Sequence, residues 1–174
     1  MPVIDVSRYK VIFLPATLLI TPEREDLLKK YILAGNRTIV WTYAPGICDG
    51  KTIDTSRVKL WSGADYKTPG PVTVDRGKWK SVYAYEFKTM TPSVLKEIIR
   101  KAGVHMYTQE ENPVYANERL LAVHFKEGGK KNISLPRSFR KVVDVISEKV
   151  VAEKASGFFC EFSTPDTKIF ELIK

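Results

Sequence analysis

The sequence predicts an α/β protein with an open, mainly parallel layer followed by a small antiparallel β domain. Two apolar, β-rich runs, Val11–Leu14 and Thr38–Tyr43, flank a segment whose apolar residues recur at helical spacing. After Gly103 the chain changes to short β-rich segments separated by turn residues. We therefore expect an α/β domain over residues 1–103 and a small β domain over residues 104–174.

The composition indicates a folded protein with a basic first half. The chain has 174 residues, of which 44% are hydrophobic and 28% charged, values that are ordinary for globular proteins. The formal charge is +8, and residues 1–103 hold 17 Lys and Arg against 10 Asp and Glu. These charges are scattered and no nucleic-acid-binding motif interleaves them, so a basic nucleic-acid-binding module is the second alternative function only.

The apolar run at residues 11–20 lacks the features of a leader peptide or a membrane span. It has no basic region before it, it contains Pro15, and it is too short to cross a bilayer. We expect a soluble chain without membrane contact, and the sequence leaves its compartment open. The two cysteines, Cys48 and Cys160, fit neither a disulfide framework nor a CxxC pattern.

The segment between the two β-rich runs has clear helix-end signals. Thr21 is a good N-cap, Pro22 suits the first helical position, and Gly35 lies where a left-handed residue commonly ends a helix. A strand, helix, strand order implies a right-handed crossover and a parallel sheet. The loop at Pro45 and Gly46 then lies at the carboxyl edge of that sheet, where α/β folds usually place their sites.

The remaining elements are shorter. The first domain is expected to contain a helix at residues 54–61, a strand at 82–87 and a helix from Thr91 to Gly103. The second domain is expected to contain seven β segments, at residues 104–108, 114–125, 132–135, 142–146, 150–153, 158–162 and 168–173.

Five segments resemble a known family. The first domain has RYKVIFLP at residues 8–15, LKKYILAG at 28–35 and TIVWTYAPGI at 38–47. These segments resemble the trimerisation domain of beta-galactosidases of the glycoside hydrolase family forty-two type, a flavodoxin-like domain related in fold to class I glutamine amidotransferases. The segments GVHMY at 103–107 and VYANERLLAVH at 114–124 resemble the short β domain that follows it in related bacterial glycosidases.

This resemblance implies a non-catalytic accessory or oligomerisation role. In the family the catalytic barrel and another strand and helix precede the segment that begins here at Arg8, so the first domain is expected to be N-terminally incomplete. No residue of this chain inherits the role of either catalytic carboxylate, and we assign no catalytic residue. The expected partners are the catalytic barrel of the same or a partner chain and further copies of this chain, with carbohydrate as a further ligand class.

Cys48 carries the main alternative, a small amidotransferase-like hydrolase. It lies in a Gly-x-Cys-x-Gly sequence, which resembles the nucleophile elbow of the amidotransferase relatives. An elbow must join a strand directly to a helix, whereas here a proline-containing loop precedes the cysteine and a polar loop follows it. His105 and His124 are not followed by a suitable acidic partner, so a plain loop cysteine is the preferred interpretation.

No pattern predicts a metal or a cofactor. His105 and His124 alternate with apolar neighbours, which is typical of residues on a sheet face, and no carboxylate cluster accompanies them. Residues 15–18, which follow the first strand, do not form the Ser/Thr/Gly-rich phosphate loop of a flavin site. We therefore expect neither a bound metal nor a cofactor.

Aromatic residues are enriched between Trp41 and Tyr85. Core packing is the preferred role of Trp41 and Trp61, whereas Trp79, flanked by lysines, is a candidate for a sugar-stacking or subunit-contact residue. The complete set of ligand or interface candidates is Trp79, Tyr43, Pro45 and Gly46.

Overall fold

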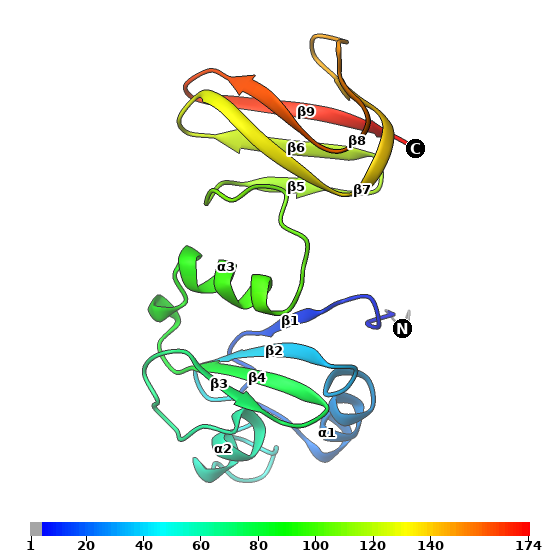
Figure 1. Cartoon of the computed structure of the whole chain (residues 1–174). Helices are drawn as coiled ribbons and strands as arrows, with labels where there is room; N and C mark the ends of the chain where they lie inside the picture. The colour runs from blue at the N-terminus through cyan, green and yellow to red at the C-terminus, as the bar shows by residue number, and fades with distance from the viewer. Residues whose placement is uncertain (1–4) are drawn as a thin grey trace. The chain divides into compact units, whose positions relative to one another are not determined.

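The computed structural model describes residues 5–174, which form two compact units divided between Val104 and His105 (Figure 1). The first unit has a four-stranded sheet with strand order β1-β2-β4-β3, and the second has a five-stranded sheet with strand order β5-β6-β9-β7-β8.

Three strands of the first sheet are parallel. The strands β1 (Val11–Leu14), β2 (Arg37–Thr42) and β4 (Trp79–Ala84) run in one direction, and β3 (Val72–Asp75) pairs antiparallel with β4. Every residue of β2 is buried because strands flank it on both sides and helices cover both faces. The loops after β1, β2 and β4 therefore meet at one edge of the sheet.

The helices of the first unit are short. Helix α1 (Pro22–Leu27) is capped by Thr21 and continues as a π-helix, η1 (Leu28–Ile32), and α2 (Ser56–Ser62) follows β2. Figure 1 shows α1 and α2 on one face of the sheet, with α3 (Pro92–Lys101) on the other. A 3-10 turn, η2 (Phe87–Thr89), precedes α3.

The predicted open, mainly parallel, flavodoxin-like layer is wrong. The chain is 18% helix and 41% strand, and five of the seven strand pairings described are antiparallel. A βαβ pattern specifies only the two strands that it joins. It gave no information on the β3–β4 hairpin or on the long antiparallel strands of the second unit, and these decide the fold class.

Each face of the first sheet has its own core. The face under α1, η1 and α2 buries the large aromatic side chains Trp41, Trp61, Trp79 and Tyr83. The face under α3 buries a smaller set of side chains: Val40, Val82, Ala84, Met90 and Ile98. The second face therefore has the thinner cover.

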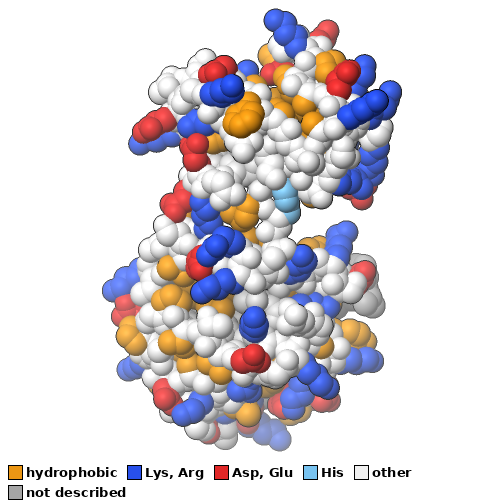
Figure 2. Space-filling model, in the orientation of Figure 1, with side chains coloured by type: hydrophobic (Ala, Val, Ile, Leu, Met, Phe, Trp, Pro, Cys, Tyr) orange, Lys and Arg blue, Asp and Glu red, His pale blue; other side chains and the backbone are white. Residues whose placement is uncertain are grey.

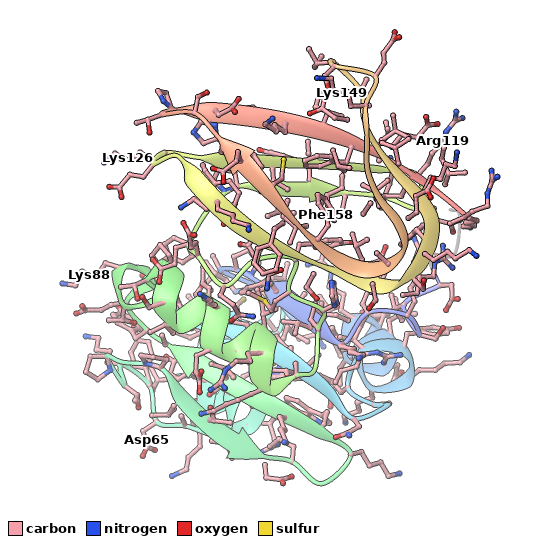
Figure 3. The ribbon with its side chains drawn as sticks, turned by 45° about the horizontal axis from the view of Figure 1, so that its top comes forward. Asp65, Lys88, Arg119, Lys126, Lys149 and Phe158 are labelled. Atoms are coloured by element: carbon pink, nitrogen blue, oxygen red, sulfur yellow. The ribbon has the colours of Figure 1, made fainter. Side chains whose placement is uncertain are left out.

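The second unit consists of antiparallel strands. These strands are β5 (Val114–Ala116), β6 (Leu120–Phe125), β7 (Gly129–Asp144), β8 (Val150–Phe162) and β9 (Asp166–Ile173). The predicted segments 132–135 and 142–146 belong largely to one long strand, β7, and the expected strand at 104–108 has no regular structure. In Figure 3, Lys149 marks the turn between β7 and β8, and Phe158 lies within the strands, where its ring packs 5.0 Å from that of Phe170.

None of the helices formed by residues 5–174 combines the length and the apolar character that a membrane span requires.

Candidate functional site

Tyr43 directly follows β2 and lies at the carboxyl edge of the parallel strands. Its φ of +66° is in the left-handed region, which costs a non-glycine residue on the order of 1–3 kcal/mol. Its N–H donates to the Ala84 carbonyl at 3.1 Å, and its own carbonyl accepts from the Tyr83 hydroxyl at 2.7 Å. The Tyr43 side chain remains 45% exposed. The fold thus holds a strained residue with its ring at the surface.

Tyr43 belongs to a tyrosine cluster that also contains Tyr66 and Tyr85. The Tyr43 and Tyr85 rings stack with their centroids 5.1 Å apart, and Tyr66 meets Tyr85 edge-on at 5.4 Å. Hydrogen bonding with Tyr66, together with burial and hydrogen bonding with Tyr43, raises the pKa of Tyr85 to about 12. The cluster presents ring faces and hydroxyl groups, which suit contact with a protein partner or a sugar ring.

Pro45 and Gly46 are the buried part of the loop that follows β2. Gly46 has a φ of +64°, and a Cβ at this position would lie 2.2 Å from Cδ1 of Trp61. Arg57 in α2 donates from Nε to the Gly46 carbonyl at 2.8 Å and from Nη2 to the Ile20 carbonyl at 3.2 Å. Arg57 therefore ties together the loops that follow β1 and β2.

Cys48 lies in the same loop but does not sit on a nucleophile elbow. Its N–H donates to the Leu18 carbonyl at 3.0 Å, and its carbonyl accepts from the Ile20 N–H at 2.9 Å. Helix α2 begins only at Ser56, so the thiol does not lie at the helix N-terminus that would stabilise a thiolate.

The two histidines lie in the second unit, where each has a hydrogen-bonding partner. His105 Nε2 lies 3.1 Å from the Ser134 carbonyl oxygen, and His124 Nδ1 lies 2.9 Å from the Thr167 hydroxyl. Within residues 5–174, no three or more His, Cys, Asp or Glu side chains are grouped in a way that could hold a metal ion.

Two carboxylates share a surface cleft in the second unit, and both have basic partners. Glu118 and Glu171 line this cleft. Lys174 lies 3.0 Å from Glu118, and Arg119, labelled in Figure 3, lies 2.7 Å from Glu171. Both carboxylates of this cleft are thus engaged in surface ion pairs.

Trp79 is buried, although its neighbours in the sequence are lysines. Its side chain is 7% exposed and packs in the same core as Trp41 and Trp61. The Arg76 guanidinium lies over the Trp79 ring, 5.5 Å from its centroid. Trp79 therefore presents no free ring face for stacking.

Sequence reasoning noted the aromatic enrichment but did not single out Tyr66 and Tyr85. These two residues lie 19 positions apart, separated by loops and two strands whose path the sequence pattern does not give. The available signal was the alternation in residues 82–87, which placed Tyr83 and Tyr85 on one side of a strand.

This chain resembles known proteins in structure, and no match in sequence was found. No protein-family model matches the chain, and no curated protein is significantly similar to it in sequence. Beta-galactosidase from Bacillus circulans sp. alkalophilus superposes with a TM-score of 0.64 at 15% identity, over 97% of this chain and 34% of that one. Gan42B, a GH42 beta-galactosidase, superposes with a TM-score of 0.57 at 15% identity, over 98% of this chain and 33% of that one. The chain thus spans about a third of the length of these beta-galactosidases and shares the fold of that part.

Proposed function

We propose that this chain is a non-catalytic accessory and assembly region of a beta-galactosidase-like glycoside hydrolase. The observation that carries the proposal is the fold match, which covers 97% of this chain but only 34% of the beta-galactosidase chain. In this proposal a separate catalytic barrel, in the same or a partner chain, performs the reaction.

Two carboxylates in the second unit, Glu118 and Glu171, bear on the non-catalytic part of the proposal. Glycosidases of the retaining type need two carboxyl groups about 5–5.5 Å apart, one as nucleophile and one as acid/base. A surface cleft of the second unit holds Glu118 and Glu171, which form ion pairs with Lys174 and Arg119. We assign neither residue a step in glycoside hydrolysis.

The tyrosine cluster is our candidate for the assembly contact. Tyrosine is enriched in the energetically important centres of protein interfaces, because a large rigid ring buries much area at little entropic cost. The Tyr43 backbone is strained, and its ring is exposed. Strained backbone residues cluster at functional sites, so the combination makes Tyr43 a candidate contact residue.

Light scattering across a concentration series tests the assembly role. We expect the wild-type chain to self-associate, and Tyr43→Asn to weaken that association by about tenfold or more, since truncating an interface tyrosine commonly costs more than 1 kcal/mol. Asparagine tolerates the left-handed backbone, so the loop should persist. The control is Tyr9→Asn, because Tyr9 is 41% exposed and lies outside the cluster. A monomer at every concentration, with no binding to a catalytic barrel, would contradict the assembly role.

Two further measurements test the non-catalytic role. The purified chain should not hydrolyse a nitrophenyl beta-galactoside, and the DNA upstream of Met1 should continue in frame into a barrel with two catalytic carboxylates.

The alternative function, a hydrolase that uses Cys48 as its nucleophile, is tested by alkylation of the thiol. Fast iodoacetamide labelling of Cys48 at neutral pH, ahead of Cys160, would favour that alternative, and slow labelling of both thiols would count against it.

A further inference from the structure

A cleft of about 510 Å³ lies between α3 and the sheet of the first unit. Helix α3 packs on Val40, Val82 and Ala84, and the cleft opens beside it, next to Thr38 and Lys80 of neighbouring strands. Its volume falls in the range of small-molecule sites. Its lining includes Lys80 and Val82 from the strands, and Val94, Glu97, Ile98 and Lys101 from α3.

The polar groups of this cleft favour a ligand that accepts hydrogen bonds and carries negative charge. Lys80 is exposed and has no ion pair within residues 5–174. Glu97 binds Arg100 at 2.7 Å and Lys101 at 3.3 Å, and hydrogen bonds from these two side chains lower its pKa. Glu97, the only carboxylate that residues 5–174 contribute to the lining, is thus already paired, while the Lys80 ammonium remains available.

The remaining lining is apolar. Val82 and Ile98 are buried and Val94 is half-buried, so they form a hydrophobic floor beside Lys80. Figure 2 shows hydrophobic side chains reaching the surface of this unit, bordered by Lys and Arg. An apolar body can therefore lie on the floor while its charged group reaches Lys80.

We propose that this cleft binds a small organic anion, with a carboxylate or phosphate at Lys80 and an apolar ring over Val82 and Ile98. The inference does not depend on the accessory role proposed above. A neutral sugar is a poorer fit, because none of the residues 5–174 contributes an aromatic ring to the lining and the Glu97 carboxylate is already paired.

Methyl NMR of the full chain tests the proposal with four probes. Benzoate and phenyl phosphate carry both a ring and a charge, benzamide carries the ring alone, and inorganic phosphate carries the charge alone. We expect the two aromatic anions to shift the methyl signals of Val82, Val94 and Ile98 with millimolar affinity, and benzamide and phosphate to bind at least about fivefold more weakly. Comparing benzoate with phenyl phosphate shows which anionic group the site prefers.

A lysine pair supplies the matched variants. Lys80→Gln should weaken benzoate binding about fivefold, whereas Lys78→Gln, on the same hairpin but outside the cleft, should change it less than about twofold. Equal binding of benzamide and benzoate would overturn the role of charge. An equal loss of benzoate affinity in Lys80→Gln and Lys78→Gln would show that the basic surface attracts anions in general, and would overturn a specific site at Lys80. Shifts that follow protein concentration and not ligand would show instead that a second copy covers the cleft, and would overturn the ligand site.

Discussion

The Tyr83 hydroxyl donates a 2.7 Å hydrogen bond to the carbonyl of Tyr43, so a fully buried residue of β4 holds the strained residue that follows β2. Burial raises the pKa of Tyr83 from its ordinary value of 10.0 to about 12, so deprotonation of the hydroxyl that donates to Tyr43 requires a more alkaline pH than in an exposed tyrosine. The position of the tyrosine cluster therefore depends on an interior side chain as well as on the loop itself.

Replacing Tyr83 by phenylalanine removes this hydrogen bond and the interaction of the hydroxyl with the Lys67 backbone, and it keeps the ring in the core. We expect Tyr83→Phe to lower the free energy of unfolding of the first unit by about 1 kcal/mol, the usual net value of one hydrogen bond. All three tryptophans of the chain lie in this unit, so tryptophan fluorescence in a urea titration follows its unfolding. Tyr31→Phe, at a residue that is 42% exposed, is the control and should have almost no effect. Equal stability of Tyr83→Phe and wild type would show that the bond to Tyr43 is not needed.

Gly46 is expected to tolerate no side chain. A Cβ at this position would lie 2.2 Å from Trp61 Cδ1 and would also meet a φ of +64°, so Gly46→Ala should destabilise the first unit by about 3 kcal/mol or more. Gly77→Ala separates the two causes, because Gly77 has a φ of +77° but no heavy atom within 4 Å of its Cβ position. It should cost only the backbone term of about 1 kcal/mol. Similar losses in the two variants would show that the Trp61 contact relaxes easily.

The sequence predicted local features better than the global fold. Thr21 and Thr91 cap helices as their residue types suggest, and the two apolar runs form parallel neighbouring strands. The strand count and the balance of pairings depend on long-range contacts, such as β6 with β9, which no local pattern specifies. The flavodoxin-like prediction for residues 1–103 was wrong because it extended one βαβ pattern to the whole layer, whereas the first sheet has four strands, one of them antiparallel, and short helices.

The candidate site was partly accessible to sequence reasoning. Tyr43 and the Pro45-Gly46 loop could be placed at the sheet edge, because a loop after a parallel strand must lie there. The burial of Trp79 could not be foreseen, since alternation in β4 leaves open which face of a strand meets the aromatic core. Arg57 was missed because a helix-face arginine is ordinarily solvent-exposed, and only the folded loops bring the Gly46 and Ile20 carbonyls to it.

Arg37 is expected to be a major stabilising residue of the first unit. Its Nη1 donates to the carbonyls of Tyr31, Ile32 and Ala34, at 3.1, 3.3 and 3.0 Å, and so satisfies the end of η1. Arg37→Met keeps the apolar stem but removes the side-chain donor of the Tyr31 and Ala34 carbonyls, while the Ile32 carbonyl still accepts from the Ala34 N–H at 2.9 Å. We expect a loss of about 2 kcal/mol in the same fluorescence assay.

The control for Arg37 removes an exposed charge instead. Lys59→Met breaks a 2.9 Å ion pair with Asp65 at the surface and should change stability by less than about 0.5 kcal/mol. If Arg37→Met is no more destabilising than Lys59→Met, the carbonyls of η1 must find other donors.

Asp144 should make the second unit sensitive to acid. Burial raises the pKa of its carboxyl, but hydrogen bonds from the Ser147 and Ile146 N–H groups and the charge of Lys168 outweigh burial and lower the pKa below its ordinary value of 3.8. The unfolded chain therefore binds this proton at a higher pH than the folded chain does. The stability contributed by Asp144 is fully present above pH 3.8 and is lost as the pH falls through the lower, folded pKa.

Carbon-13 NMR of the Asp144 carboxyl group measures this pKa directly, and amide hydrogen exchange at Phe158 and Phe170 follows the stability of the surrounding core. Asp144→Asn should lower the protection of these amides near pH 7, because the carboxylate hydrogen bonds are weakened. Below pH 3.8 the protection of the variant should fall less steeply than that of the wild type, because the variant has no carboxylate to protonate. A carboxyl pKa above 3.8, or an unchanged acid profile in Asp144→Asn, would mean that burial dominates and that the turn between β7 and β8 is held by other contacts.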